Sequence, residues 1–109
     1  MNEADEIMQT VEHLQQVLEN LIVRGLRSAG SQERATLQAL REEFDRIGAH
    51  HLAGRIGTLY DALQADDRAA AAALLKTQAS LRVFERVLTL EVAQAALGQL
   101  AQEAGDEPE

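Results

Sequence analysis

The amino-acid sequence predicts an all-α fold, an antiparallel bundle of four to five helices with short connections. Three observations lead to this prediction. The apolar residues are mostly Ala and Leu, which favour helix, and aromatic residues amount to only 3%. The single proline, Pro108, is the penultimate residue, so no pyrrolidine ring interrupts residues 1–107. Apolar residues recur at helical spacing along most of the chain. We expect one bundle domain over residues 1–104 and a disordered acidic tail over residues 105–109.

The first predicted helix covers residues 4–26. Its apolar residues recur at alternating steps of three and four: Ala4, Ile7, Val11, Leu14, Leu18 and Leu21. Polar residues occupy the opposite side, so this helix is amphipathic and must bury one face against a neighbour. The stretch SAGS at residues 28–31 predicts the turn that follows it.

A second helix is predicted to start with Ser31 as its N-cap and Glu33 in its first turn. Its apolar residues are Leu37, Leu40, Phe44 and Ile47. The next apolar residue, Leu52, follows Ile47 by five positions instead of three or four, and Gly48 lies at this change of phase. We therefore expect one helix to end at Gly48 and another to begin after it.

The third helix is expected to run to the stretch QADDR at residues 64–68, which predicts a turn. Asp66 or Asp67 would cap the helix that follows. From this point to residue 102 no strong helix breaker occurs. One unbroken helix over residues 67–102 would be about 54 Å long at 1.5 Å per residue. A compact domain of this size has a radius of gyration of only about 13 Å. The run therefore either breaks near residues 76–80, with Ser80 as a cap, or projects toward a partner.

The segment from residue 81 to residue 97 carries apolar residues on most of its circumference. One stripe consists of Leu81, Phe84 and Leu88, and a second of Val83, Val87, Leu90 and Leu97. A helix that is apolar nearly all round is either central in its bundle or shared with another chain. We expect a protein partner, or a second copy of the chain in a dimer, to bind an interface made of Leu81, Val83, Phe84, Val87, Leu88 and Leu90.

The net charge of −8 is unevenly distributed. Residues 1–23 hold five acidic residues and no basic one, and residues 87–109 repeat this balance. Between them, ten basic residues are interspersed with eight acidic ones, which disfavours a phosphate-binding groove and nucleic acid as a ligand. The acidic N-terminus lacks a signal-peptide pattern, and the longest apolar run, residues 69–75, is too short to span a membrane. We expect a cytoplasmic protein without a membrane contact.

The three histidines do not have the spacing of a helical metal site. Such sites pair a histidine with a ligand three or four positions away. No carboxylate lies three residues before His13, His50 or His51, and no ligand lies three or four residues after them. The chain also has no cysteine, and its serines fall at predicted helix ends. The sequence therefore predicts no metal, no cofactor, no small-molecule substrate and no catalytic residues, so we expect a protein that is not an enzyme.

The stretch AHHLAG at residues 49–54 resembles the phosphoacceptor motif of histidine phosphotransfer domains, commonly Ala-His-x-Leu-Lys-Gly. Ala49, His50, Leu52 and Gly54 match the motif, and Ala53 stands at the lysine position. The resemblance implies a small helical bundle with His50 as phosphoacceptor and Gly54 leaving room for the phosphoryl group. The alternative is structural: the histidines start a helix, and Gly54 and Gly57 let a neighbouring helix approach.

The sequence as a whole favours a small acidic non-catalytic interaction module, an adaptor, accessory subunit or regulator that binds through an apolar helix face and self-associates. Two alternatives stay open at this point. One is histidine phosphotransfer through His50. The other is an acidic mimic that blocks a basic site on a partner protein.

Overall fold

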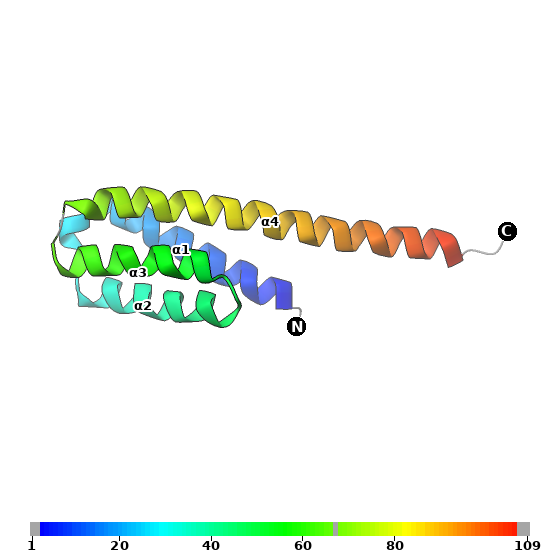
Figure 1. Ribbon diagram of the computed structural model, residues 1–109, viewed down its shortest axis with the longest axis horizontal. Coiled ribbons are helices and arrows are strands. Elements are labelled where there is room, and N and C mark those ends of the chain that lie inside the picture. The colour runs from blue at the N-terminus through cyan, green and yellow to red at the C-terminus, as the bar shows by residue number, and fades with distance from the viewer. Residues whose placement is uncertain (1–2, 67, 107–109) are drawn as a thin grey trace.

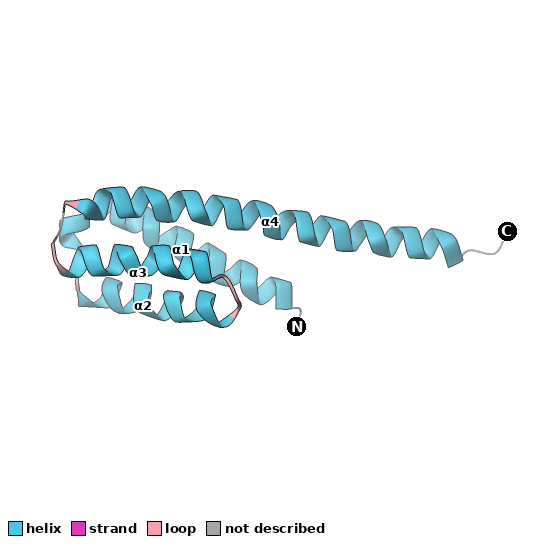
Figure 2. Cartoon of the chain, viewed as in Figure 1, coloured by secondary structure: helices cyan, strands magenta, loops and turns pink. Residues whose placement is uncertain are grey.

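The computed structural model describes residues 3–66 and 68–106 of the chain. These residues form four α-helices and one short 3₁₀ turn: α1 (Glu3–Arg24), η1 (Leu26–Ser28), α2 (Ser31–Arg46), α3 (His50–Gln64) and α4 (Ala69–Asp106). Short loops join helices that run antiparallel to one another (Figure 1, Figure 2). The predicted all-α bundle is confirmed, with four helices in the described part of the chain.

Two glycines with positive φ separate the first three helices. Gly25 follows α1 with φ 91°, and Gly48 lies between α2 and α3 with φ 90°. Glycine adopts this backbone conformation without the steric cost that a side chain imposes. At Gly48 the chain turns back, and the Ala49 N–H donates to the Phe44 carbonyl oxygen at 2.8 Å. The predicted break at Gly48 is therefore confirmed.

The start of α2 differs from the prediction by one residue. Gly30 occupies the N-cap position, and Ser31 is already the first helical residue. The Glu33 carboxylate accepts a hydrogen bond from the Gly30 N–H at 2.9 Å and lies 4.0 Å from the Arg24 guanidinium. In a capping box, the side chain at the third helical position accepts a hydrogen bond from the N–H of the N-cap residue, and Glu33 does so here. Ser31 does not cap the helix.

The hydrophobic core lies between the four helices. α3 packs against α2 and α4, and α1 packs against the same two helices. The largest fully buried side chains are Val11, Leu14, Leu18, Leu37, Phe44, Ile56, Leu59 and Thr77. Small buried residues on α3 and α4 allow these two helices to approach closely, because the distance between helix axes depends on the side chains at the contact. These residues are Ala53, Ala62, Ala70 and Ala73.

α4 also contacts helices other than α3. The Phe84 ring meets the Phe44 ring of α2 edge to face, with centroids 5.8 Å apart and an interplanar angle of 88°. Such an arrangement brings the positive edge of one ring to the negative face of the other. Gln15 of α1 donates a side-chain hydrogen bond to the Glu85 carboxylate. These contacts secure α4 to the bundle as far as its middle.

α4 is one helix of 38 residues, about 57 Å long at 1.5 Å per residue. The break considered near residues 76–80 does not occur. Thr77 is fully buried, and its Oγ1 donates to the Ala73 carbonyl at 2.8 Å and to the Arg55 carbonyl at 3.2 Å. The described residues measure 67 × 23 × 23 Å, and Figure 1 shows α4 extending far beyond the ends of the other helices. The run is therefore unbroken and projects beyond the bundle.

The two ends of α4 bear on two further predictions. At its start, Asp66 lies in the preceding turn with a positive φ of 52°, and Asp67 lies outside the described residues. At its end, the helix includes residues 105 and 106, the first two residues of the predicted tail. Residues 107–109 lie outside the described residues.

Among the helices described, none is both long and apolar enough to cross a membrane.

Candidate functional site

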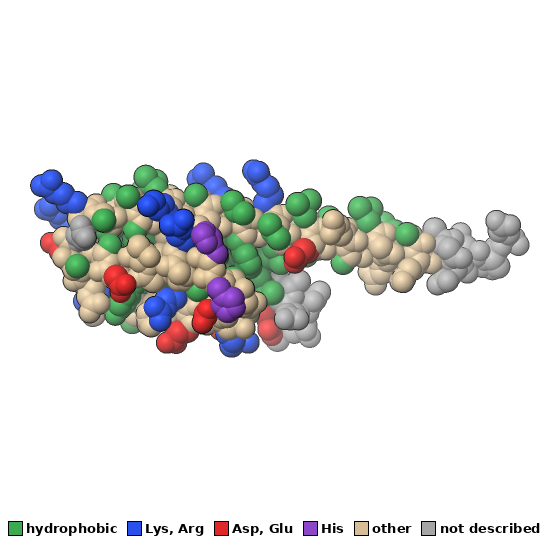
Figure 3. All heavy atoms as spheres, viewed as in Figure 1, with side chains coloured by type: hydrophobic (Ala, Val, Ile, Leu, Met, Phe, Trp, Pro, Cys, Tyr) green, Lys and Arg blue, Asp and Glu red, His purple; other side chains and the backbone are tan. Residues whose placement is uncertain are grey.

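The C-terminal half of α4 is the most exposed part of the described structure. Every side chain from residue 89 to residue 102 is exposed, and we call this segment the overhang. Its large apolar residues are Leu90, Val92, Leu97 and Leu100. Figure 3 shows apolar side chains along this arm, well separated from the body of the bundle. Large exposed apolar side chains that gather on one segment often mark an interaction site.

The structure divides the six residues of the predicted interface into two groups. Leu81 and Leu88 are only 3% and 7% exposed, and Phe84 is half-buried against Phe44. These three side chains belong to the core of this chain, so their assignment to an interface is wrong. Val83 and Leu90 are 63% and 57% exposed, and Val87 is exposed as well. Only this second group is available to a partner.

Three exposed residues of the overhang were missing from the predicted interface: Val92, Leu97 and Leu100. The sequence does contain a signal for them. α2 and α3 have 16 and 15 residues, whereas α4 has 38. A helix more than twice as long as α2 and α3, and 16 residues longer than the 22-residue α1, must leave one end uncovered, so its last apolar residues become surface residues. The spacing of the apolar residues alone does not show which of them are uncovered, because it is the same in every turn of the helix.

His50 lies at the N-terminus of α3, on the surface. Its side chain is 72% exposed, and its Nδ1 lies 2.5 Å from Oδ1 of Asp45, at the end of α2. The turn at Gly48 brings these two residues together, and both also line a shallow groove with Arg41 and Asp61. The site thus combines one imidazole, one guanidinium and two carboxylates on an open surface.

The two glycines of α3 have different surroundings. A Cβ at Gly57 would lie 3.2 Å from Cδ of Arg41, so the absence of a side chain there makes room for the Arg41 side chain of α2. A Cβ at Gly54 would meet no atom within 4 Å. At Gly57 the predicted close approach is present, although the Arg41 side chain, and not a helix backbone, is what comes close. At Gly54 the prediction is wrong. Gly54 instead leaves open space one turn after His50.

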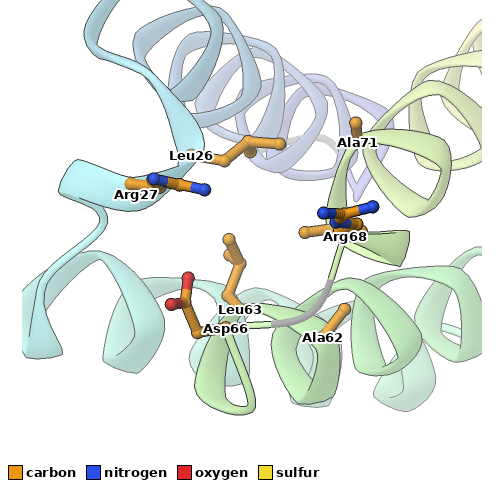
Figure 4. A pocket seen from close by; sticks show the side chains of 8 residues that line it. Leu26, Arg27, Ala62, Leu63, Asp66, Arg68 and Ala71 are labelled. Atoms are coloured by element: carbon orange, nitrogen blue, oxygen red, sulfur yellow. The ribbon is translucent and has the colours of Figure 1, made fainter.

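A small cavity lies at the opposite end of α3, between η1 and the start of α4 (Figure 4). The side chains of Leu26 and Leu63 point into the space, and those of Arg27 and Arg68 lie on opposite sides of it. The cavity volume is about 150 Å³. Ligand pockets usually measure about 300–1,000 Å³, so this cavity is too small for an ordinary cofactor or metabolite.

The described residues contain no group of three His, Asp or Glu side chains placed to hold a metal ion. Comparisons with protein-family models, with curated proteins and with solved structures find no match for this chain.

Proposed function

We propose that this chain is a small acidic interaction module without catalytic activity, an adaptor, accessory subunit or regulator that acts in the cytoplasm. It binds a protein partner through the exposed apolar face of α4. The observation that carries the proposal is the overhang, a helical arm that presents Leu90, Leu97 and Leu100 with no neighbouring helix in the described structure.

The stability of the overhang supports this proposal. The overhang continues the part of α4 that the bundle holds, so its free end is the C-terminal one, where the last backbone carbonyls have no partner within the helix. The overhang also contains Gly98, and a glycine inside a helix costs about 1 kcal/mol relative to alanine. A protein surface that covers the apolar side chains of this arm would offset these costs. The arm is therefore best explained as half of an interface.

The overhang does not have the composition of an acidic mimic. Glu91 is its single charged residue, and the remainder is apolar, small or amide-bearing. A surface that imitates a polyanion needs clustered carboxylates, because charge complementarity supplies its specificity. Association through this arm should therefore depend weakly on salt concentration.

A phosphoacceptor role for His50 is the second candidate function. Its exposed ring and the open space at Gly54 favour it. The Asp45 carboxylate, 2.5 Å from the ring, works against it, because a negative group repels an incoming phosphoryl group. Incubation with a phosphorylated receiver domain tests the role. Acid-labile label on the wild type that disappears in His50→Gln would support it, and an unlabelled wild type would remove it.

Native mass spectrometry of the tagged protein, purified gently from its own host, tests the interaction module. The informative variant is Leu90→Ser with Leu97→Ser, which removes two apolar side chains of the overhang. The matched control is Leu75→Ser, because Leu75 is 65% exposed on the same helix but lies beside the bundle. We expect the wild type and the control to carry a stoichiometric partner, either a second copy of the chain or another protein, and the double variant to be a bare monomer. A bare monomer in all three samples, or an unaffected complex, would contradict the proposal.

A further inference from the structure

The exposed residues of α4 have the spacing of a coiled coil. Starting at Val83, one face of the helix presents residues at alternating steps of four and three, which is the spacing of a seven-residue repeat. We call this set the seam: Val83, Val87, Leu90, Gln94, Leu97 and Ala101. All six are exposed, and they extend over about 27 Å of helix at 1.5 Å per residue. The seam is therefore long enough for two to three heptads.

The residue types of the seam fit a parallel two-stranded arrangement. In heptad notation Val87 takes an a position, and Leu90 and Leu97 take d positions. Among parallel coiled coils, a β-branched residue at a with leucine at d favours two strands over three or four. Gln94 takes the next a position, where a polar side chain can bond to its counterpart in the other strand and so specify register. The remaining apolar residues of the seam are Val83 at a d position and Ala101 at an a position.

The two charges that flank the seam are complementary between two parallel copies. Arg86 takes a g position and Glu91 the e position five residues later. In a parallel in-register pair, the g residue of one strand lies beside the following e residue of the other. Two symmetric Arg86–Glu91 pairs would therefore form. Within one chain a separation of five residues places these side chains on different sides of the helix, and neither forms an ion pair with the other described residues.

The bundle leaves the seam accessible. The residues that face the core recur at Leu74, Leu81 and Leu88, each seven positions from the last and all buried. Val83 and Leu90 also lie seven positions apart, but on a different side of α4, and both are exposed. A second helix can therefore lie along the seam without displacing α1 or α3.

We propose that the occupant of the seam is a second copy of this chain, docked in parallel and in register through the overhang. The inference rests on the proposed function, since it assigns the partner of that same surface. It also commits to an orientation, in which Gln94 meets Gln94 and each Arg86 meets the Glu91 of the other copy.

Sedimentation of the full chain over a range of concentrations tests the association. We expect a monomer–dimer equilibrium that shifts to the dimer as concentration rises. Arg86→Glu alone should raise the dimer dissociation constant about tenfold, because both pairs become repulsive. Arg86→Glu combined with Glu91→Arg should restore the wild-type value. A failure of the second substitution to restore the dimer would overturn the pairing.

Engineered disulfides test the orientation, because the chain has no cysteine of its own. Val87→Cys and Leu97→Cys should each form a disulfide between identical copies under mild oxidation. Thr89→Cys is the control, exposed on the same helix but outside the seam, and should not cross-link. A disulfide formed only when the Val87→Cys and Leu97→Cys proteins are mixed would show an antiparallel pair and refute the proposal.

A wild-type chain that stays monomeric at every concentration would also refute it. That result would not refute the proposed function, which native mass spectrometry of the host-purified protein tests separately. A different protein bound to the overhang would still appear in that experiment. Circular dichroism of each variant confirms that the bundle is intact, as expected for substitutions at exposed positions.

Discussion

The contact between Phe44 and Phe84 offers a quantitative test of how α4 is attached to the bundle. Phe44 is fully buried and Phe84 half-buried, with ring centroids 5.8 Å apart. Phe44→Leu keeps an apolar side chain but leaves part of the ring volume empty, which should cost about 1.5 kcal/mol of unfolding free energy. Phe84→Leu removes a ring that is partly in water, so about 1 kcal/mol is expected.

The double variant measures the interaction itself. An edge-to-face aromatic pair is worth about 0.5–1.5 kcal/mol beyond the area that it buries. Either single substitution already removes this interaction, so the double variant should be about 1 kcal/mol more stable than the sum of the two single losses predicts. Phe→Leu is preferred to Phe→Ala, because a loss of about 4 kcal/mol could unfold a small domain.

Urea unfolding followed by circular dichroism at 222 nm is the assay, at a protein concentration low enough to keep the chain monomeric. Leu75→Ala is the control, since this exposed leucine of α4 should change the unfolding free energy by less than about 0.5 kcal/mol. A coupling below about 0.3 kcal/mol would lie within the additivity of independent sites. The two rings would then not be in contact, and the described attachment of α4 would be wrong.

Three further predictions concern other parts of the molecule. A chain truncated after Leu88 should have an unfolding free energy within about 1 kcal/mol of that of the full-length monomer, because the overhang makes no buried contact in the described structure. A larger loss in urea unfolding would contradict this prediction. Thr77→Val should lower the unfolding free energy by about 1 kcal/mol or less in the same assay, because the Ala73 and Arg55 carbonyls keep their helix hydrogen bonds when the Thr77 hydroxyl is removed. A loss above about 2 kcal/mol would show that these carbonyls depend on the hydroxyl. A hydrogen bond from Arg46 lowers the pKa of Glu43 below 4.5, so this pair stabilises the fold above that pH and loses its effect as the pH falls through the lowered pKa. In an NMR titration Arg46→Gln should return the pKa of Glu43 toward 4.5, and an unchanged value would refute the assignment.

The helix boundaries could be predicted from the sequence because their signals are local. The five-residue step from Ile47 to Leu52, with Gly48 between them, requires a change of backbone direction, and the structure has one there. The predicted end of the first helix, at residue 26, lies two residues beyond the observed end at Arg24, because Gly25 adopts a positive φ. A glycine signal of this kind is also local, so the sequence does contain it.

The division of α4 into a buried and an exposed face could not be predicted in the same way. The stripes that contain Leu81 and Val83 have similar spacing and similar hydrophobicity, so periodicity gives no reason to prefer one. The choice depends on contacts distant in sequence, such as that between Phe84 and Phe44. The Asp45–His50 contact likewise depends on the geometry of the turn at Gly48, which composition does not specify.

The two faces of α4 overlap along the helix, and this overlap has a consequence for binding. The buried face ends at Leu88, whereas the exposed seam already begins at Val83. The turn that carries Val83 and Val87 is therefore held by the bundle before any partner arrives. Ordering flexible groups is one of the main costs of association, so a pre-formed first turn lowers that cost. Association should begin at Val83 and Val87 and extend along the overhang. On this argument, Val87→Ser should slow association more than Ala101→Ser, which stopped-flow measurements on the two variants would show.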